Sequence, residues 1–110
     1  MNGDYIDIND ALPRLGNNEG LYKKLLKSFL SEKSVPMFEE SIRANDIKNS
    51  QYAAHTIKGI AANLSLKALH REAAAADAQL KEGKIEEASV NSFKAVLNET
   101  IDEVKKYLGE

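Results

Sequence analysis

The chain has 110 residues, which is enough for one ordinary domain with a core of its own. Its 43% hydrophobic and 29% charged residues indicate a globular protein, and a formal charge of −2 argues against a general electrostatic grip on nucleic acid. The sequence has no cysteine, which excludes disulfides and thiol chemistry, and no apolar run near the ~20 residues of a membrane span.

Apolar residues recur at three- and four-residue spacing along the whole chain, which predicts an all-helical protein. In chain order, the predicted helices span residues 6–15, 19–33, 36–45, 47–64, 66–82 and 85–108. Asn18, Asp46 and Ser65 are the expected N-caps, and Gly83 is an expected C-terminal stop. Short connections between long amphipathic helices make antiparallel neighbours. We therefore expect a single domain over residues 1–110, an antiparallel up-and-down four-helix bundle with a short N-terminal helix.

Two of these helices carry the clearest predicted core stripes. The stripe of helix 19–33 comprises Leu21, Tyr22, Leu25, Leu26, Phe29 and Leu30. That of helix 85–108 comprises Ala88, Phe93, Val96, Leu97, Ile101, Val104 and Leu108.

One histidine, His55, lies in an apolar stretch of helix 47–64 but points away from its core stripe. With an advance of about 100° per residue, the stripe falls roughly 140° to 240° from His55. It contains Ala53, Ile57, Ile60, Ala61 and Leu64. The side of His55 itself carries Gln51, Lys58, Gly59 and Ala62, within about 60° of it.

Gly59 needs an explanation, because a glycine inside a helix costs about 1 kcal/mol relative to alanine. Close packing against another helix is one reading. The alternative is that Gly59 and Ala62 keep the surface beside His55 low, so that another protein can approach. Lys58, one turn from His55, places an ammonium where it can meet an anion attached to the imidazole.

The stretch "HTIKGIAANLS" resembles the signature of histidine-containing phosphotransfer (HPt) domains, with His55, Lys58, Gly59 and Asn63 at matching positions. The similarity continues through Leu69 and Ala73, and upstream "ALPRLGNNEGLYKKLLKSFL" is similar to the first long helix of bacterial members. The chain differs where the family usually has glycine, at Ser65, and where it has Leu-Glu, at Ala76-Asp77.

The resemblance implies that His55 receives a phosphoryl group from the aspartyl phosphate of one receiver domain and donates it to another. A neutral imidazole is a competent nucleophile, and Nε2 is the expected site of attachment. Lys58 is expected to stabilise the phosphate, with Lys81 as a weaker contact. By family alignment, Asp77 is expected to orient the imidazole through Nδ1, although an ordinary solvated acid is the other reading.

The other residues near His55 are expected to contribute to the surface or to the structure and not to the chemistry. Gly59 and Ala62 are expected to form the surface that the partner approaches, and Gln51 to border it. Asn63 is expected to be structural, and His70 to be a surface residue.

The resemblance further implies a phosphocarrier without autokinase activity, either free-standing or the C-terminal module of a hybrid sensor kinase. Its partners are then receiver domains of response regulators or hybrid kinases, with no nucleic acid or membrane contact. The carrier is expected to be a cytoplasmic monomer. The chain itself needs no metal or cofactor, since Mg²⁺ is expected on the receiver. The alternatives are a non-phosphorylated helical adaptor and a degenerate HPt-like docking domain.

Overall fold

The computed structural model describes residues 3–110, and in that range it contains helices and turns but no strand. This confirms the all-helical prediction. In chain order the elements are α1 (Ile8–Ala11), the 3₁₀ helix η1 (Leu12–Leu15), α2 (Glu19–Phe29), α3 (Ser34–Arg43), α4 (Ile47–Leu64), α5 (Lys67–Lys81) and α6 (Glu87–Leu108).

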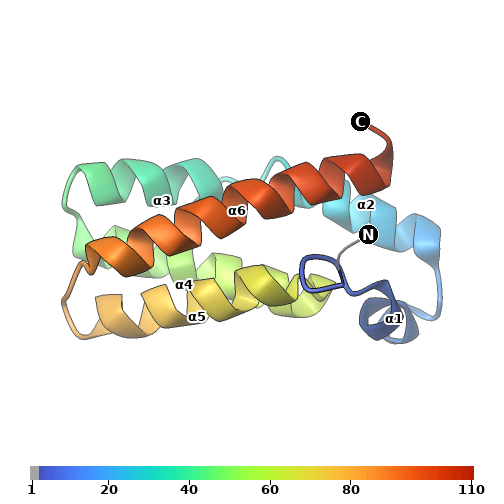
Figure 1. The fold of residues 1–110 in the computed structure, drawn as a ribbon, viewed down its shortest axis with the longest axis horizontal. Helices are drawn as coiled ribbons and strands as arrows, with labels where there is room; N and C mark the ends of the chain where they lie inside the picture. Colours follow the sequence, from blue (N-terminus) through green and yellow to red (C-terminus); the bar gives the residue numbers. More distant parts are fainter. Residues whose placement is uncertain (1–2) are drawn as a thin grey trace.

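Figure 1 shows how these helices form a bundle. Helices α2 and α3 follow one another along one edge, α4 runs back beneath them, α5 returns beside α4, and α6 crosses the length of the molecule above that pair. The helices therefore alternate in direction, with α2 and α3 together forming the first member. The expected antiparallel four-helix bundle is confirmed, and α1 and η1 stand at its N-terminal end.

The helix predicted over residues 19–33 stops earlier, at Phe29. The backbone N–H and hydroxyl of Ser34 both donate to the Glu32 carboxylate, at 3.0 and 2.6 Å, and this local pairing opens α3. Pro36 then sits in the first turn of α3, where its missing N–H costs nothing. The predicted first helix, 6–15, is likewise divided into α1 and η1, with Pro13 inside η1.

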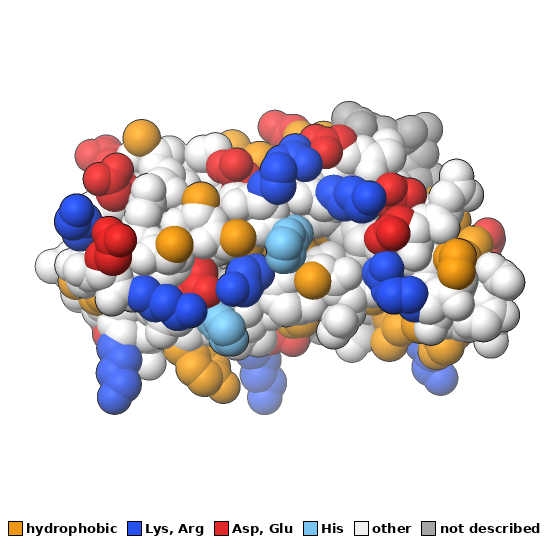
Figure 2. Space-filling model, turned by 90° about the horizontal axis from the view of Figure 1, so that it is seen from below, with side chains coloured by type: hydrophobic (Ala, Val, Ile, Leu, Met, Phe, Trp, Pro, Cys, Tyr) orange, Lys and Arg blue, Asp and Glu red, His pale blue; other side chains and the backbone are white. Residues whose placement is uncertain are grey.

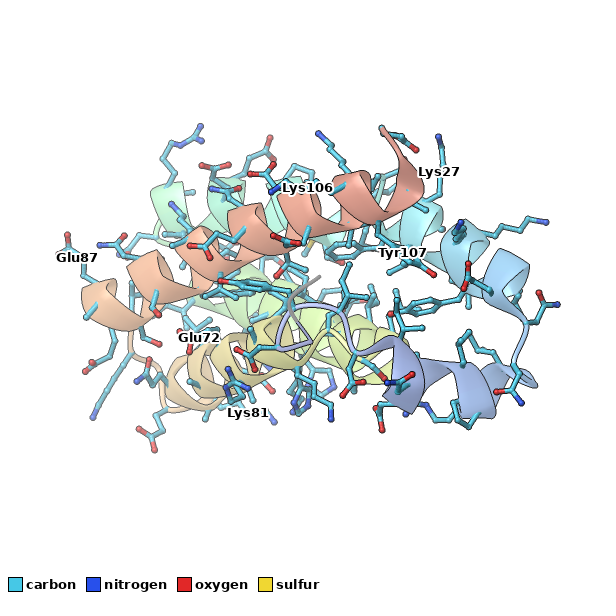
Figure 3. The ribbon with its side chains drawn as sticks, turned by 45° about the vertical axis from the view of Figure 1, so that its right-hand side comes forward. Lys27, Glu72, Lys81, Glu87, Lys106 and Tyr107 are labelled. Atoms are coloured by element: carbon cyan, nitrogen blue, oxygen red, sulfur yellow. The ribbon has the colours of Figure 1, made fainter. Side chains whose placement is uncertain are left out.

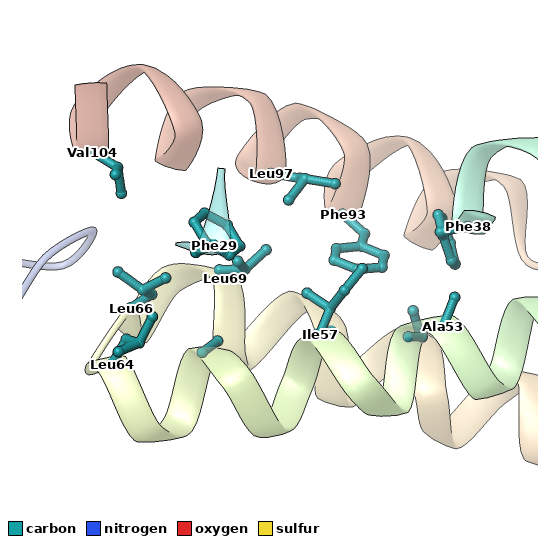
Figure 4. Close-up of a cluster of buried hydrophobic side chains, with 14 of the residues drawn as sticks. Phe29, Phe38, Ala53, Ile57, Leu64, Leu66, Leu69, Phe93, Leu97 and Val104 are labelled. Atoms are coloured by element: carbon teal, nitrogen blue, oxygen red, sulfur yellow. The ribbon is translucent and has the colours of Figure 1, made fainter. Parts of the chain in front are cut away.

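The core lies between α4, α5 and α6 and is closed by α2 and α3 (Figure 4). The Phe38 and Phe93 rings meet edge to face with centroids 4.7 Å apart, which is a favourable aromatic geometry. Three residues predicted to be buried are exposed. Ala88 lies on the solvent side of the first turn of α6, and Leu21 and Leu25 of α2 are 39% and 37% exposed. The predicted stripe of helix 19–33 was too wide because only Tyr22, Leu26 and Phe29 are buried in α2.

A tight turn joins α4 to α5, and it corrects the predicted role of Ser65. Ser65 has a left-handed φ of 57°, and the Leu66 N–H donates to the Ala61 carbonyl at 2.9 Å, as in the usual helix-ending turn. Leu66 is the N-cap of α5, so Ser65 ends α4 rather than capping α5. A left-handed backbone favours glycine, so serine at this position carries a conformational penalty.

The Ser65 hydroxyl and the end of α4 are held by the N-terminal region. Ser65 donates to Asp10 at 2.6 Å, and Arg14 donates to the Ser65 hydroxyl at 2.6 Å and to the Asn63 carbonyl at 3.0 Å. The bond to Asn63 satisfies a carbonyl at the end of α4, where the helix itself supplies no donor. Within residues 3–110, no helix combines the length and hydropathy of a membrane span.

Candidate functional site

His55 lies near the middle of α4, a helix whose N-terminus is capped by a side chain. Asp46 caps α4 through a 3.1 Å bond from the Asn49 N–H. Ala53 and Ile57, on either side of His55 in the chain, are completely buried, whereas the His55 side chain is 58% exposed. Figure 2 shows the two histidines of the chain on one face, with lysine and arginine side chains around them.

The Asp77 carboxylate of α5 lies directly beneath the imidazole. Its Oδ2 atom is 3.2 Å from His55 Nδ1, and the Asp77 side chain is only 2% exposed. Small buried residues permit α4 and α5 to approach closely enough for this short side chain to reach across. They are Ala53, Ala54, Ala61, Ala73 and Ala76.

Asp77 is ionised at neutral pH despite its burial. Burial alone raises the pKa of a carboxyl group, but hydrogen bonds from Gln51, His55 and Lys58 and the charge of Lys81 outweigh it and lower the pKa to about 2. An ionised carboxylate can only accept hydrogen bonds. In the neutral ring of His55, Nδ1 therefore carries the proton, and the Nε2 lone pair lies on the exposed side of the ring.

Two lysines also reach Asp77 Oδ2. Lys58 Nζ lies 3.1 Å away from it, and Lys81 Nζ lies 3.6 Å away, one turn along α5. The Lys58 side chain is partly buried, whereas Lys81, labelled in Figure 3, is more open to solvent. Positive charge from both helices thus surrounds the base of the imidazole.

Gln51, which the sequence placed at the border of the docking surface, makes a contact that sequence reasoning missed. Its Nε2 donates to Asp77 Oδ1 at 2.6 Å, one turn before His55 on α4. The only sequence signal for this contact was the spacing Gln51–His55–Lys58, which puts the three side chains on one side of α4.

Gly59 and Ala62 are both exposed on the His55 side of α4. A Cβ atom built on Gly59 would have no neighbour within 4 Å among the described residues. Packing against the described residues therefore gives no reason for glycine at this position.

A surface groove lies next to Gly59 and Ala62 of α4, and the sequence did not predict it. It lies between α2 and the end of α4 and is lined by Leu25, Ser28, Phe29, Glu32, Ile60, Asn63 and Leu64. Leu25 had been assigned to the core. Leu25 is exposed because α2 buries only the face that carries Tyr22, Leu26 and Phe29, and the apolar stripe in the sequence is wider than that face.

Asn63 and His70 lie outside the group of side chains that contact Asp77. Asn63 is exposed near the end of α4, where its backbone carbonyl accepts a hydrogen bond from Arg14. His70 is half-buried on α5. Among residues 3–110, no three His, Asp or Glu side chains are grouped so that they could hold a metal ion.

Comparison with known proteins gives one match. The family model of the Hpt domain matches residues 24–107, which include α3 to α5, the second half of α2 and all of α6 except its last residue. No curated protein and no solved structure matches the chain.

Proposed function

The chain belongs to the Hpt domain family, whose members carry phosphoryl groups in phosphorelays, and we propose that His55 is its phosphoryl-accepting residue. It accepts the group from the aspartyl phosphate of one receiver domain and passes it to another. The observation that carries this proposal is the exposed imidazole of His55, whose Nδ1 is held 3.2 Å from the buried carboxylate of Asp77.

Asp77 prepares His55 for attack. Because Nδ1–H donates to an ionised carboxylate, the Nε2 lone pair faces the solvent, where a receiver can present its phosphoryl group. A nucleophile held in one tautomer and one orientation loses little freedom on the way to the transition state. Asp77 is thus a positioning residue, and His55 is the nucleophile.

Lys58 and Lys81 supply the charge that phosphoryl transfer requires. Transfer depends mainly on in-line placement and on stabilising the charge of the phosphoryl oxygens. Both ammonium groups already lie at the base of the imidazole, through Asp77 Oδ2, and both side chains have the length to turn toward a phosphoryl group on Nε2. Mg²⁺ is expected from the receiver domain.

The receiver approaches over Gly59 and Ala62. Open space above Gly59 supports this, as does the neighbouring groove, where Leu25 and Ile60 offer apolar contact area. Gln51 contributes to the site through Asp77 rather than as part of this surface. The partners are receiver domains of response regulators or of hybrid sensor kinases, and the chain acts as a cytoplasmic monomer without autokinase activity.

Phosphoryl transfer from phosphorylated receiver domains tests the proposal. The native chain should acquire an acid-labile, base-stable label, and a His55→Gln variant should acquire none. Label that persists in His55→Gln would move the site elsewhere, with His70 the next residue to test. Measurable docking without label on the native chain, across a broad panel of receivers, would identify an adaptor or a degenerate docking domain instead.

A further inference from the structure

The Asp77 carboxylate is held at both of its oxygens, and the two oxygens have different partners. Oδ2 meets His55 Nδ1, Lys58 and Lys81, whereas Oδ1 accepts a 2.6 Å hydrogen bond from Gln51. The partners on Oδ2 can move, because each of these side chains is partly or largely exposed. The Gln51 bond is the shortest of the four contacts and is the one that fixes the far oxygen.

The direction of the Gln51 bond follows from the charge of Asp77. An ionised carboxylate has no proton to give, so the Gln51 amide must present its NH₂ group to Oδ1. A buried carboxylate oxygen that lost this donor would be left without a partner in a site that excludes water. Rotation of the carboxylate, or its protonation, would then release Nδ1.

We propose that Gln51 is a second positioning residue, which fixes the Asp77 carboxylate so that the proton stays on His55 Nδ1 before and after phosphoryl transfer. This inference rests on the proposed function of His55. It assigns Gln51 to the chemistry of the site instead of the partner surface.

The proton balance of the transfer explains why the carboxylate must stay in place. The Nε2 lone pair forms the N–P bond while the P–O bond to the receiver aspartate breaks, and that electron pair leaves on the aspartate carboxylate. Nδ1 keeps its proton throughout, so the ring becomes a phosphoimidazolium cation. The ionised Asp77, 3.2 Å from Nδ1, stabilises this positive charge. Lys58 and Lys81 also contact Asp77, and their positive charges repel the charge on the ring. In the reverse direction the N–P bond breaks and its electron pair returns to Nε2, so the ring that still carries the Nδ1 proton leaves as a neutral imidazole instead of an imidazolate. Retention of the proton therefore serves donation as well as acceptance.

The test compares Gln51→Met, which keeps the length of the side chain and removes the donor, with Gln79→Met as a matched control. Gln79 lies about 200° around α5 from Asp77, on the opposite side of that helix. Three quantities are measured: the ¹⁵N shifts of the His55 ring, which report the tautomer; the pKa of the Asp77 carboxyl from its ¹³C shift; and the rate of transfer from a phosphorylated receiver. The midpoint of thermal unfolding shows whether each variant is folded.

We expect Gln51→Met to raise the pKa of Asp77 from about 2 toward its ordinary value, because the Gln51 bond is a main cause of the depression. The share of the tautomer protonated at Nε2 should rise, and transfer should slow about tenfold, as is typical for the loss of an orienting partner. Gln51→Glu, which sets a second carboxylate against Oδ1, should raise the pKa of Asp77 further. Gln79→Met should leave all three quantities unchanged.

Two results would overturn the inference. One is a native tautomer with native transfer in folded Gln51→Met. The other is slow transfer with native tautomer and native Asp77 pKa, which would return Gln51 to the partner surface. The ring and carboxyl measurements need no receiver. They therefore judge Gln51 even if the native chain accepts no phosphoryl group, a result that would instead refute the function proposed for His55.

Discussion

At the scale of single residues, the feature that organises the site is a buried acid that stays charged. Asp77 is almost completely buried, yet four donors from α4 and α5 converge on it. A buried charge is tolerated when it is paired and hydrogen-bonded, and removal of one partner is then costly. Asp77 consequently couples the stability of the fold to the state of the site.

Acid should reveal this coupling. The folded-state pKa of Asp77, about 2, lies below the ordinary value of 3.8, so its contribution to stability is complete above about pH 4 and is lost as the pH falls toward 2. The depression corresponds to about 2 kcal/mol. Urea unfolding between pH 2 and pH 6 should show a smaller loss of stability for Asp77→Asn than for the native chain. Equal losses of stability in Asp77→Asn and the native chain would show that the pKa of Asp77 is not lowered in the folded state.

Two tyrosines at the α2 end of the bundle form a natural comparison. The Tyr22 hydroxyl donates to the Leu64 carbonyl at 2.6 Å, whereas the buried Tyr107 hydroxyl has no hydrogen-bond partner among the described residues. The rings lie side by side with centroids 6.1 Å apart, and Tyr107 is labelled in Figure 3.

Tyr22→Phe should therefore destabilise the protein by about 1–2 kcal/mol. Tyr107→Phe should leave its stability unchanged or raise it by up to about 1 kcal/mol, because no bond is lost. Denaturant unfolding of the two variants measures both values. A loss of more than about 1 kcal/mol in Tyr107→Phe would mean that its hydroxyl has a partner after all.

At the scale of the element, α4 carries a glycine that the fold itself does not need. Gly59→Leu should raise stability by about 0.5–1 kcal/mol through helix propensity, since the new side chain enters open space. The same side chain should hinder a docking receiver and slow transfer by about tenfold, a barrier of about 1.4 kcal/mol. Stopped-flow transfer and thermal unfolding measure the two effects. Asn91→Leu, on an exposed position of α6, is the control for an added surface leucine. Unchanged transfer in Gly59→Leu would remove Gly59 from the docking surface.

The end of α4 illustrates a compromise between backbone and side chain. Ser65 adopts a left-handed φ that favours glycine, but its hydroxyl joins Asp10 and Arg14. Ser65→Ala loses both bonds and keeps the backbone penalty, whereas Ser65→Gly loses the bonds and relieves the penalty. Ser65→Ala should therefore be less stable than Ser65→Gly by about 1 kcal/mol, and both less stable than the native chain. Chemical denaturation checks this order; the reverse order would contradict the left-handed assignment.

At the scale of the whole molecule, the reactive side chains and the groove share α4 but differ in the second helix that each one uses. His55, Asp77 and their partners lie on α4 and α5, whereas the wall that contains Leu25 comes from α2. Docking and reactivity should therefore be separable by mutation.

Leu25→Glu tests this separation. Leu25 is exposed, so stability should change by less than about 0.5 kcal/mol. Transfer from a phosphorylated receiver should show a raised KM with kcat little changed, because contact area is lost while the nucleophile is intact. Phosphorylation by phosphoramidate, a small donor that needs no groove, should be normal. Asn91→Glu is the matched surface control, and an unchanged KM in Leu25→Glu would exclude the groove from docking.

The sequence predicted α4 and α5 to within about one residue, because caps and apolar periodicity agree there. The Asp46 cap and the outward direction of His55 both follow from spacing along a single helix. The predicted role of Ser65 was wrong because serine is a preferred N-cap residue, whereas the left-handed position that it occupies is usually glycine.

Features that depend on two elements could not be predicted from spacing. The Gln51–Asp77 bond requires the distance and rotation between α4 and α5, which small buried residues decide. The groove depends on where α2 ends, and the Ser34–Glu32 pairing that ends it has no periodic signal. Leu21 and Leu25 were predicted to be buried because periodicity along one helix does not show how much of its apolar face the neighbouring helices cover.

The confinement of His55, Lys58, Asp77 and Lys81 to one helical hairpin has a consequence for how such carriers diverge. Gene duplicates can exchange or redesign α2 to change the receiver they serve while inheriting the hairpin intact. Selection for insulation between parallel pathways would then act on residues such as Leu25, and these residues would diverge rapidly. Substitutions of His55, Lys58, Asp77 or Lys81 would instead be purged, because they impair transfer to every receiver at once.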